Sequence, residues 1–245
     1  MPVPAKAFQR WLQGAAPMAS MADISRMSGI KRTTLAQQLV RGKVAESTLV
    51  SVSRAVGINP VTALAYFDTF ADLRKEQPPP RPEELVSQIA TTDLLHAVIA
   101  RSIPDDPGVP PAPQPPLIPA PHATSVRNWV DAIDDGELRH RVSAATGIAP
   151  QNYSAQLTAN RLTPELAIAT ALAAGVAPTG GLVATGLITE EEAGWAPEAR
   201  QRALAGLSDG ELASLAGERL QAIGRTLRRQ EQDHERTEKI WENLG

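Results

Sequence analysis

The chain contains no cysteine, which excludes disulfide bonds and thiolate metal sites. Its four histidines are scattered without the spacing of metal ligands. They are His96, His122, His140 and His234. No run of about 18 apolar residues is present, so nothing is expected to span a membrane. The N-terminus also lacks the basic-then-apolar pattern of a signal peptide. We therefore expect a cytoplasmic protein with no metal and no other cofactor.

Aromatic residues make up only 4% of the 245 residues, although 42% of the chain is apolar. The cores must therefore be built mainly from Ala, Leu, Val and Ile, which suits small helical modules. Segments in which apolar and polar residues strictly alternate, the pattern of a half-buried strand, are also missing. An all-α protein of about two domains is the expectation.

An internal repeat is the clearest feature that is present. Residues 11–64 match residues 129–182 at a constant offset of 118, without a gap. The identical positions include Trp11 and Trp129, Ser25 and Ser143, Gly29-Ile30 and Gly147-Ile148, Gln38-Leu39 and Gln156-Leu157, Gly57 and Gly175, and Pro60 and Pro178. A repeat of this length is a small domain and not a unit of a solenoid. We predict one helical module used twice, as copy 1 (residues 1–76) and copy 2 (residues 123–190).

Charge is shared unevenly between the copies. Residues 1–76 hold ten Lys and Arg against five Asp and Glu, a net charge of +5. Residues 124–197 hold four against eight, a net charge of −4. The formal net charge of the whole chain, −3, hides this difference. Because the local field decides whether a polyanion is attracted, copy 1 suits nucleic acid better than copy 2 does.

Copy 1 predicts five short helices separated by glycine. Gly29 stands where the second helix ends and the chain needs a positive φ. The predicted spans are residues 5–13, 19–28, 31–40, a fourth helix from the N-cap Ser47, and a fifth from the N-cap Asn59 to about Leu73.

The second and third helices, with the tight turn at Gly29, predict a helix–turn–helix. This unit needs a small residue four positions before the glycine and an apolar residue directly after it. It needs another apolar residue six positions after the glycine, to anchor the third helix in the core. Copy 1 supplies Ser25, Ile30 and Leu35, and copy 2 supplies Ser143, Ile148 and Tyr153.

These motifs resemble the Cro/CI-like (lambda-repressor-like, XRE-type) helix–turn–helix proteins, over roughly residues 5–70 and 123–188. In copy 1 the resemblance rests on residues 24–30, 39–43 and 55–60. In copy 2 it rests on Val142-Ser143, Gly147-Ile148, and residues 157–161 and 173–178. The family implies five helices, of which the third enters the major groove of DNA. Its members are mostly repressors of phages and mobile elements, or bacterial regulators.

The resemblance implies that the start of the third helix reads base edges. Arg and Lys donate to guanine, and Gln pairs with adenine. The predicted DNA-binding residues of copy 1 are Lys31, Arg32, Thr33, Thr34, Gln37, Gln38, Arg41 and Lys43. Arg41 and Lys43 are expected at phosphate. Gln38 is identical in both copies, so a packing or hydrogen-bonding role is an equal alternative. An ordinary solvated helix face is the alternative for the whole set.

In copy 2 the third helix is expected to begin at Ala149-Pro150, because proline suits a first helical turn. Its predicted DNA-binding residues are Gln151, Asn152 and Ser154 at bases, Asn160 and Arg161 at phosphate, and Arg139 and Arg141 at the start of the second helix, which in this family approaches the DNA backbone. Four acidic residues crowd the preceding segment, Asp131, Asp134, Asp135 and Glu137. A net charge of −4 loses much of the counterion release that drives DNA binding. Copy 2 is therefore either a second DNA reader or a copy retained for assembly.

The remaining segments predict an accessory helix at 82–102, a proline-rich linker at 103–122 and a charged C-terminal helical segment at 198–245. Nine of the residues from Pro104 to Pro121 are proline, which favours a semi-rigid polyproline II spacer over a protein-binding ligand. The apolar positions of the C-terminal segment are Leu212, Leu215, Leu220, Ile223 and Leu227, and the pattern lapses until Ile240. A long coiled coil is therefore not expected.

The sequence thus predicts a sequence-specific, double-stranded DNA-binding repressor of the phage or mobile-element immunity type. Two unlike helix–turn–helix domains would read an asymmetric operator. A homodimer through helix 83–102 or the C-terminal helix is a further possibility. The alternative is an antitoxin-like interaction protein, in which copy 2 serves assembly. Neither an enzyme nor a small-molecule ligand is expected, because no nucleophile, metal or phosphate-loop constellation is recognisable.

Overall fold

The computed structural model describes residues 2–102 and 115–242, with the backbone alone for residues 236–242. The described chain is mostly helical, which confirms the all-α class. Its β-structure in those ranges is one short antiparallel pair, β1 (Val3–Pro4) and β2 (Lys43–Val44), with Val3 opposite Val44. No described helix is long and apolar enough to cross a membrane.

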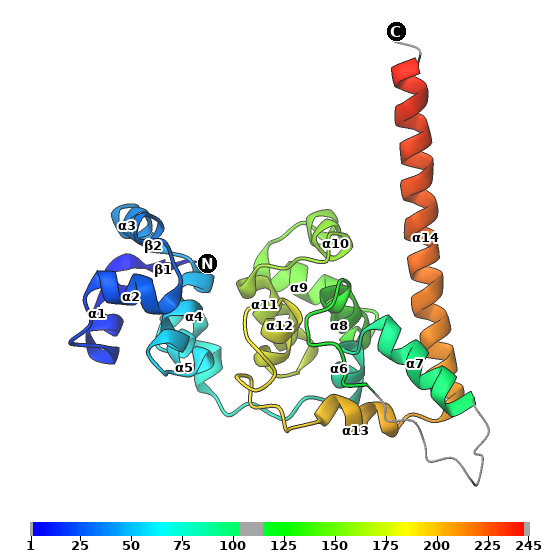
Figure 1. Cartoon of the computed structure of the whole chain (residues 1–245), viewed down its shortest axis with the longest axis horizontal. Coiled ribbons are helices and arrows are strands. Elements are labelled where there is room, and N and C mark those ends of the chain that lie inside the picture. The colour runs from blue at the N-terminus through cyan, green and yellow to red at the C-terminus, as the bar shows by residue number, and fades with distance from the viewer. Residues whose placement is uncertain (1, 103–114, 243–245) are drawn as a thin grey trace. The chain divides into compact units, whose positions relative to one another are not determined.

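The helices of the two copies follow the offset in the sequence (Figure 1). Copy 1 contains α1 (Ala5–Ala15), α2 (Met21–Ser28), α3 (Arg32–Val40), α4 (Glu46–Ala55), α5 (Pro60–Ala65) and the 3-10 helix η1 (Asp68–Arg74). Copy 2 contains α8 (Ser125–Ile133), α9 (Leu138–Thr146), α10 (Pro150–Thr158), α11 (Pro164–Ala174) and α12 (Pro178–Ala184). Pro150 begins α10 as predicted, 118 residues after Arg32.

Two predicted bounds in copy 1 are wrong. The fourth helix begins at Glu46 after Ala45, which makes no side-chain cap, so Ser47 is not the N-cap. Asn59 does cap the fifth helix, but that helix ends at Ala65 instead of near Leu73. The chain turns extended at Phe67, with φ −93° and ψ 139°, and η1 follows. The rings of both Phe67 and Phe70 are buried in the core at this break.

The described residues form two hydrophobic cores. The core of copy 2 is built around Trp129 and Tyr153, which are each 1% exposed. The core of copy 1 also contains residues that lie in copy 2 or directly after it. They are Ile168, Leu182, Val183, Ile188 and Trp195. Copy 1 and copy 2 therefore share apolar packing.

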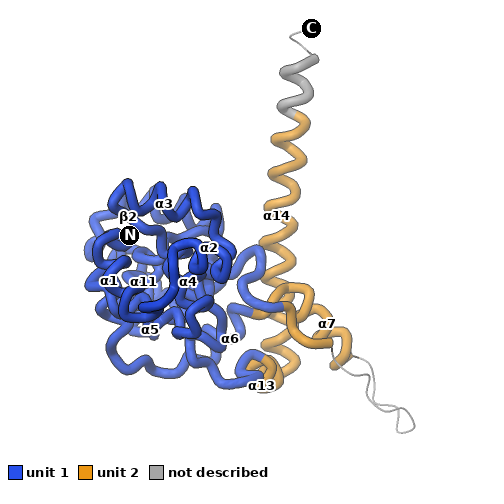
Figure 2. The backbone as a smooth tube through the Cα atoms, turned by 60° about the vertical axis from the view of Figure 1, so that its left-hand side comes forward, with its two compact units in different colours: residues 1–88, 119–200 blue, residues 89–118, 201–245 orange. Residues whose placement is uncertain are grey.

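The chain divides into two compact units, coloured separately in Figure 2. Unit 1 comprises residues 1–88 and 119–200, and so contains both copies. Unit 2 comprises residues 89–118 and 201–245. The proline-rich linker falls largely on residues 103–114, which lie outside the described residues, and residues 115–122 form no helix.

The accessory helix predicted at 82–102 is two helices, α6 (Pro82–Ser87) and α7 (Thr91–Ser102). The buried Gln88 lies at the break. Its carbonyl oxygen accepts a hydrogen bond from Arg200 Nη1 (3.0 Å), and its Nε2 donates to the carbonyl oxygen of Ser125 (3.2 Å). These long-range bonds replace continuation of the helix.

Unit 2 is built on α7 and the long helix α14 (Asp209–Glu242), while α13 (Ala199–Ala205) spans the boundary between the units. The helix α14 begins directly after Ser208, and Ser208 and Glu211 form a reciprocal cap there. Leu212 is buried. Further along α14, Leu220, Ile223 and Leu227 are exposed by 46%, 38% and 52%.

Candidate nucleic-acid interface

The turn between α2 and α3 is held by serine hydrogen bonds. Gly29 has a φ of +70°, in the left-handed region that glycine adopts without steric cost. Ser25 Oγ donates to the carbonyl oxygen of Ile30 (2.6 Å), and Ser28 Oγ donates to that of Ile24 (2.7 Å). Ser25 therefore acts as a hydrogen-bond donor as well as the small residue that the packing needs.

The same turn recurs between α9 and α10. Gly147 has a φ of +71°, and Ser143 Oγ donates to the carbonyl oxygen of Ile148. The anchoring residues Leu35 of α3 and Tyr153 of α10 are each 1% exposed. Both copies therefore hold their third helix by residues at the same positions of the repeat.

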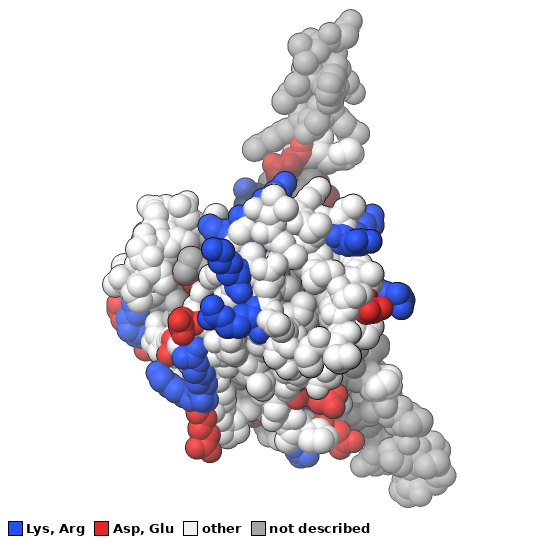
Figure 3. Space-filling view, turned by 90° about the vertical axis from the view of Figure 1, so that its left-hand side faces the viewer, with Lys and Arg blue, Asp and Glu red and all other residues white. Residues whose placement is uncertain are grey.

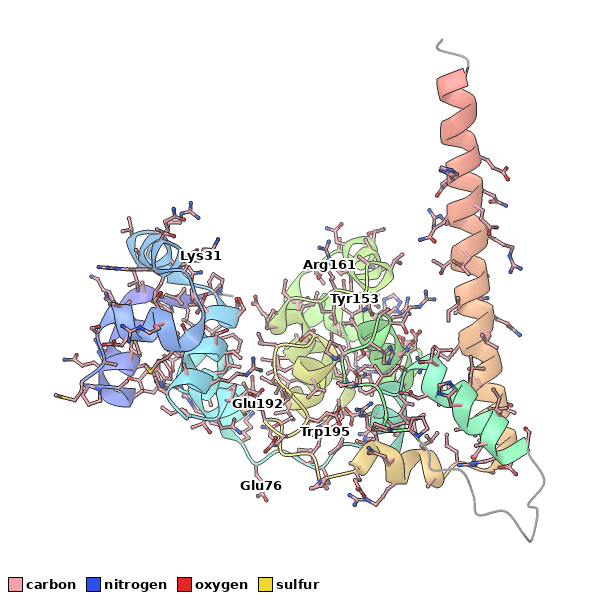
Figure 4. All side chains as sticks on the ribbon, in the orientation of Figure 1. Lys31, Glu76, Tyr153, Arg161, Glu192 and Trp195 are labelled. Atoms are coloured by element: carbon pink, nitrogen blue, oxygen red, sulfur yellow. The ribbon has the colours of Figure 1, made fainter. Side chains whose placement is uncertain are left out.

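Because Leu35 faces the core, α3 turns its opposite side to solvent. Figure 4 shows Lys31, the residue before the helix, at the upper edge of copy 1. The predicted base-reading residues that are exposed are Lys31, Arg32, Thr33, Thr34 and Gln37. The structure thus exposes polar side chains at the start of a short helix whose opposite face is anchored in the core by Leu35.

Four basic side chains surround α3. Arg41 and Lys43 follow the helix and are exposed, as are Lys31 and Arg32 at its start. Over residues 2–102 and 115–235 none of the four forms an ion pair. Figure 3 shows blue side chains gathered across the upper part of this face, at the height of α3 in Figure 1, with most red ones lower. Uncompensated positive charge on one face is the electrostatic footprint of a polyanion site.

Gln38 lies apart from these exposed residues. Its Oε1 accepts a hydrogen bond from the backbone N–H of Ala45 (2.9 Å), and its Nε2 donates to Thr48 Oγ1 (3.0 Å). The side chain therefore ties α3 to the start of α4, which favours the hydrogen-bonding alternative for this residue.

In copy 2 the corresponding helix face is polar but uncharged. Gln151 and Asn152 are exposed at the start of α10, and Ser154 is half-buried. Arg161 is exposed, and Figure 4 shows it at the same upper edge as Lys31. Since both copies belong to unit 1, α3 and α10 lie along one edge of a single compact unit (Figure 1).

The two arginines at the start of α9 have acidic partners. Arg139 pairs with Asp131 (3.4 Å) and with Asp134 (3.3 Å). Arg141 pairs with Asp135 (3.0 Å), and this contact lowers the pKa of the Asp135 carboxyl below its ordinary value. The acidic cluster seen in the sequence therefore compensates the charges that were expected to face phosphate.

Asn160 has a structural role that the sequence did not reveal. It stands where copy 1 has Gly42 and adopts a positive φ of +50°. Its Oδ1 accepts a hydrogen bond from the backbone N–H of Arg127 in the first turn of α8 (3.2 Å). Asn160, which was predicted to lie at phosphate, thus uses its side-chain oxygen within the fold and keeps only Nδ2 as a side-chain donor.

Three polar residues that join copy 1 to the segment after α12 were not predicted. Arg54 Nε and Nη2 donate to the two carboxylate oxygens of Glu192 (2.6 and 2.7 Å). Asn59 Nδ2 donates to the carbonyl oxygen of Glu192 (3.0 Å). The sequence carried one signal, because Leu172 and Ala177 occupy the positions of Arg54 and Asn59 in copy 2.

Within the ranges that the structure describes, no group of three or more His, Asp or Glu side chains is arranged to hold a metal ion. Comparison with known proteins finds no family model, no curated protein and no solved structure that matches the chain.

Proposed function

We propose that the protein is a sequence-specific, double-stranded DNA-binding transcriptional repressor of the phage or mobile-element immunity type, acting on the nucleoid in the cytoplasm. In this proposal α2–α3 and α9–α10 are the helix–turn–helix units of two tandem, lambda-repressor-like domains. The observation that carries it is the set of four exposed basic side chains around α3, which form no ion pair over residues 2–102 and 115–235, beside Thr33, Thr34 and Gln37.

The chemistry of this face suits a major groove. Arg32 can donate two parallel hydrogen bonds to guanine O6 and N7, and Gln37 can pair with adenine N6 and N7. Lys43 and Arg41, beyond the helix end, are placed for phosphate contacts that fix the register without reading sequence. Each such contact releases counterions and so makes the affinity depend on salt.

The two units would read different sequences. Residues 31–34 are Lys-Arg-Thr-Thr, whereas residues 149–152 are Ala-Pro-Gln-Asn. A single chain that placed both units on one duplex would read an asymmetric site, whereas an ordinary dimer with one unit in each chain requires a palindrome. The common edge of α3 and α10 in unit 1 supports this arrangement.

A selected-site binding experiment with the full chain tests the proposal. Random duplexes are bound, recovered and sequenced over several rounds, and the enriched sequence is then used in mobility shifts at several salt concentrations. We expect one asymmetric motif whose affinity falls steeply with salt. The absence of any enriched sequence would refute the proposed function.

A second candidate is that copy 2 serves assembly, as in an antitoxin-like interaction protein. The pairing of Arg139 with Asp131 and Asp134 favours it, because a neutralised surface attracts phosphate less. The double variant Gln151→Ala, Asn152→Ala separates the candidates. Loss of sequence preference over one part of the motif supports two readers, and unchanged binding supports assembly.

The exposed apolar positions on α14 support a homodimer as a further proposal. Leu220, Ile223 and Leu227 follow the three- and four-residue spacing of a helix–helix seam. Sedimentation of the wild type against Ile223→Glu tests it. We expect a dimer that the variant converts to a monomer, and a monomeric wild type would contradict it.

A further inference from the structure

We propose that Arg54, Asn59 and Glu192 form a clamp that fixes the spacing between the two DNA segments read by α3 and α10. The inference rests on the proposed function and extends it, because it assigns spacing selectivity to residues that do not touch DNA. These three are positioning residues, and they act through the relative placement of copy 1 and copy 2.

The first part of the clamp is a bidentate ion pair. Arg54, in the last turn of α4, donates from Nε and Nη2 to Glu192 Oε1 and Oε2 at 2.6 and 2.7 Å. Arg54 Nη2 also donates to the carbonyl oxygen of Leu187 (3.3 Å). Two parallel bonds fix the orientation of the carboxylate as well as its distance. The side chain of Glu192 is 17% exposed and that of Arg54 is 43% exposed, so the pair is partly shielded from solvent.

The second part of the clamp uses the amide of Asn59. Its Oδ1 accepts a hydrogen bond from the N–H of Val61 and so caps α5 (2.7 Å), while its Nδ2 donates to the carbonyl oxygen of Glu192 (3.0 Å). The Asn59 side chain thus bonds both to α5 and to the segment after α12. The segment after α12 is thereby attached to both α4 and α5 of copy 1.

That segment is itself ordered from within. Thr189 N donates to Glu192 Oε2 (2.8 Å), and Glu192 N donates to Thr189 Oγ1 (3.2 Å). Ile188 and Trp195 are 3% and 7% exposed in the core of copy 1. The polar clamp therefore sits on an apolar contact, and together they restrict movement between the copies.

The clamp residues Arg54 and Asn59 occur in copy 1 and have no equivalent in copy 2. At the offset of 118, Leu172 replaces Arg54 and Ala177 replaces Asn59. A framework residue inherited from the duplication would be expected in both copies, as Ser25 and Gly29 are. Arg54 and Asn59 instead differ where the copies meet, which is the pattern expected of residues with a role in joining them.

If α3 and α10, the two reading heads, are held rigidly relative to each other, they can contact both DNA segments at only one spacing between those segments. Each inserted base pair moves one half-site by about 3.4 Å and rotates it by roughly 35°, since a turn contains about 10 to 10.5 base pairs. Heads joined by a flexible linker would follow such shifts at small cost. Heads held by the clamp would not, so one of them would lose its contacts.

The test uses the full chain and the motif from site selection, with one, two or five base pairs inserted between its two parts. Arg54→Ala removes the ion pair, and Glu192→Gln weakens it from the other side. Arg74→Ala is the matched control, because Arg74 also bonds two carbonyl oxygens and a carboxylate, all of them within copy 1. Circular dichroism confirms that each variant is folded.

For the wild type and Arg74→Ala, we expect each insertion to raise Kd at least about tenfold, the scale of losing one reading head. For Arg54→Ala we expect Kd on the original motif within about threefold of wild type, and an insertion penalty smaller than that of the wild type, because the apolar contact of Ile188 and Trp195 still restrains the copies. Equal insertion penalties in wild type and Arg54→Ala, or none in the wild type, would overturn the clamp while specific binding stands. Failure to bind any motif specifically would instead refute the proposed function.

Discussion

The salt dependence of DNA binding should distinguish unpaired from paired basic residues. Lys43 has no ion pair among the described residues, whereas Arg139 contacts two carboxylates, Asp131 and Asp134. Both side chains lie at positions that the resemblance assigns to the DNA backbone. If local charge governs phosphate binding, Lys43→Ala should lower the salt dependence and Arg139→Ala should not.

The magnitude follows from Arg41 and Lys43, the two side chains near α3 that are proposed to contact phosphate. If each neutralises one phosphate, log K should fall with log salt at a slope of about −1.8. Between about 50 and 200 mM salt the affinity of the wild type would then fall roughly 12-fold. Lys43→Ala leaves one such contact, so its slope should be about −0.9 and its loss roughly 3.5-fold. Arg139→Ala should keep the slope of the wild type, because its charge is already compensated.

Fluorescence anisotropy with a labelled duplex, at five or more salt concentrations in that range, measures these slopes. Random-sequence DNA should give the same difference between Lys43→Ala and the wild type, since phosphate contacts carry no sequence information. The reasoning would be refuted by equal slope changes in both variants, or by a larger change in Arg139→Ala.

Three further predictions concern base reading, fold stability and pH. Arg32→Ala should weaken binding to the selected motif by about 1–3 kcal/mol and leave binding to random DNA nearly unchanged; equal losses on both DNAs would argue against a base contact. Gln38→Ala removes two hydrogen bonds and should lower the free energy of unfolding by about 1–3 kcal/mol in urea denaturation without changing base preference; an altered motif with unchanged stability would reverse that assignment. Burial raises the pKa of Glu84, which accepts a hydrogen bond from Trp129 Nε1, so the folded state holds the proton more tightly than the unfolded state. The free energy of unfolding of the wild type, measured relative to Glu84→Gln, should therefore fall as pH rises from the ordinary Glu pKa of about 4.3 toward the raised value. A difference that stays flat or grows over this range would contradict the assignment.

Much of the fold was predictable because the information is local and appears twice. Gly29 and Gly147 mark the same left-handed helix ends, and Ser25 and Ser143 mark the same close approach. Each of these signals is weak alone, but their identical spacing in both copies specifically indicates a helix–turn–helix. The exposure of Lys31 and Arg32 follows from the same logic, because Leu35 fixes which side of α3 faces the core.

What the sequence did not predict depends on contacts between distant residues. At the break between α6 and α7, Gln88 bonds to Arg200 and Ser125, which lie far along the chain. The helix α5 ends before Phe67, where the backbone turns extended, and the sequence pattern did not locate this end. The ion pairs of Arg139 were only hinted at by nearby aspartates.

The candidate site shows the same division. Exposure of the residues at the start of α3 followed from helical periodicity. The roles of Gln38, which joins α3 to α4, and of Asn160, which caps α8, depend on partners that lie in other elements. Arg54 and Glu192 are separated by 138 residues, and only the failure of the repeat at Arg54 pointed to them.

The central claim is that α3 reads DNA sequence. The most direct measurement is site selection carried out in parallel with the wild type and with Arg32→Ala, each as the full chain. We expect the wild type to enrich an asymmetric motif and the variant to enrich the same motif with one position relaxed. Identical motifs from both proteins, or no motif from the wild type, would contradict the claim.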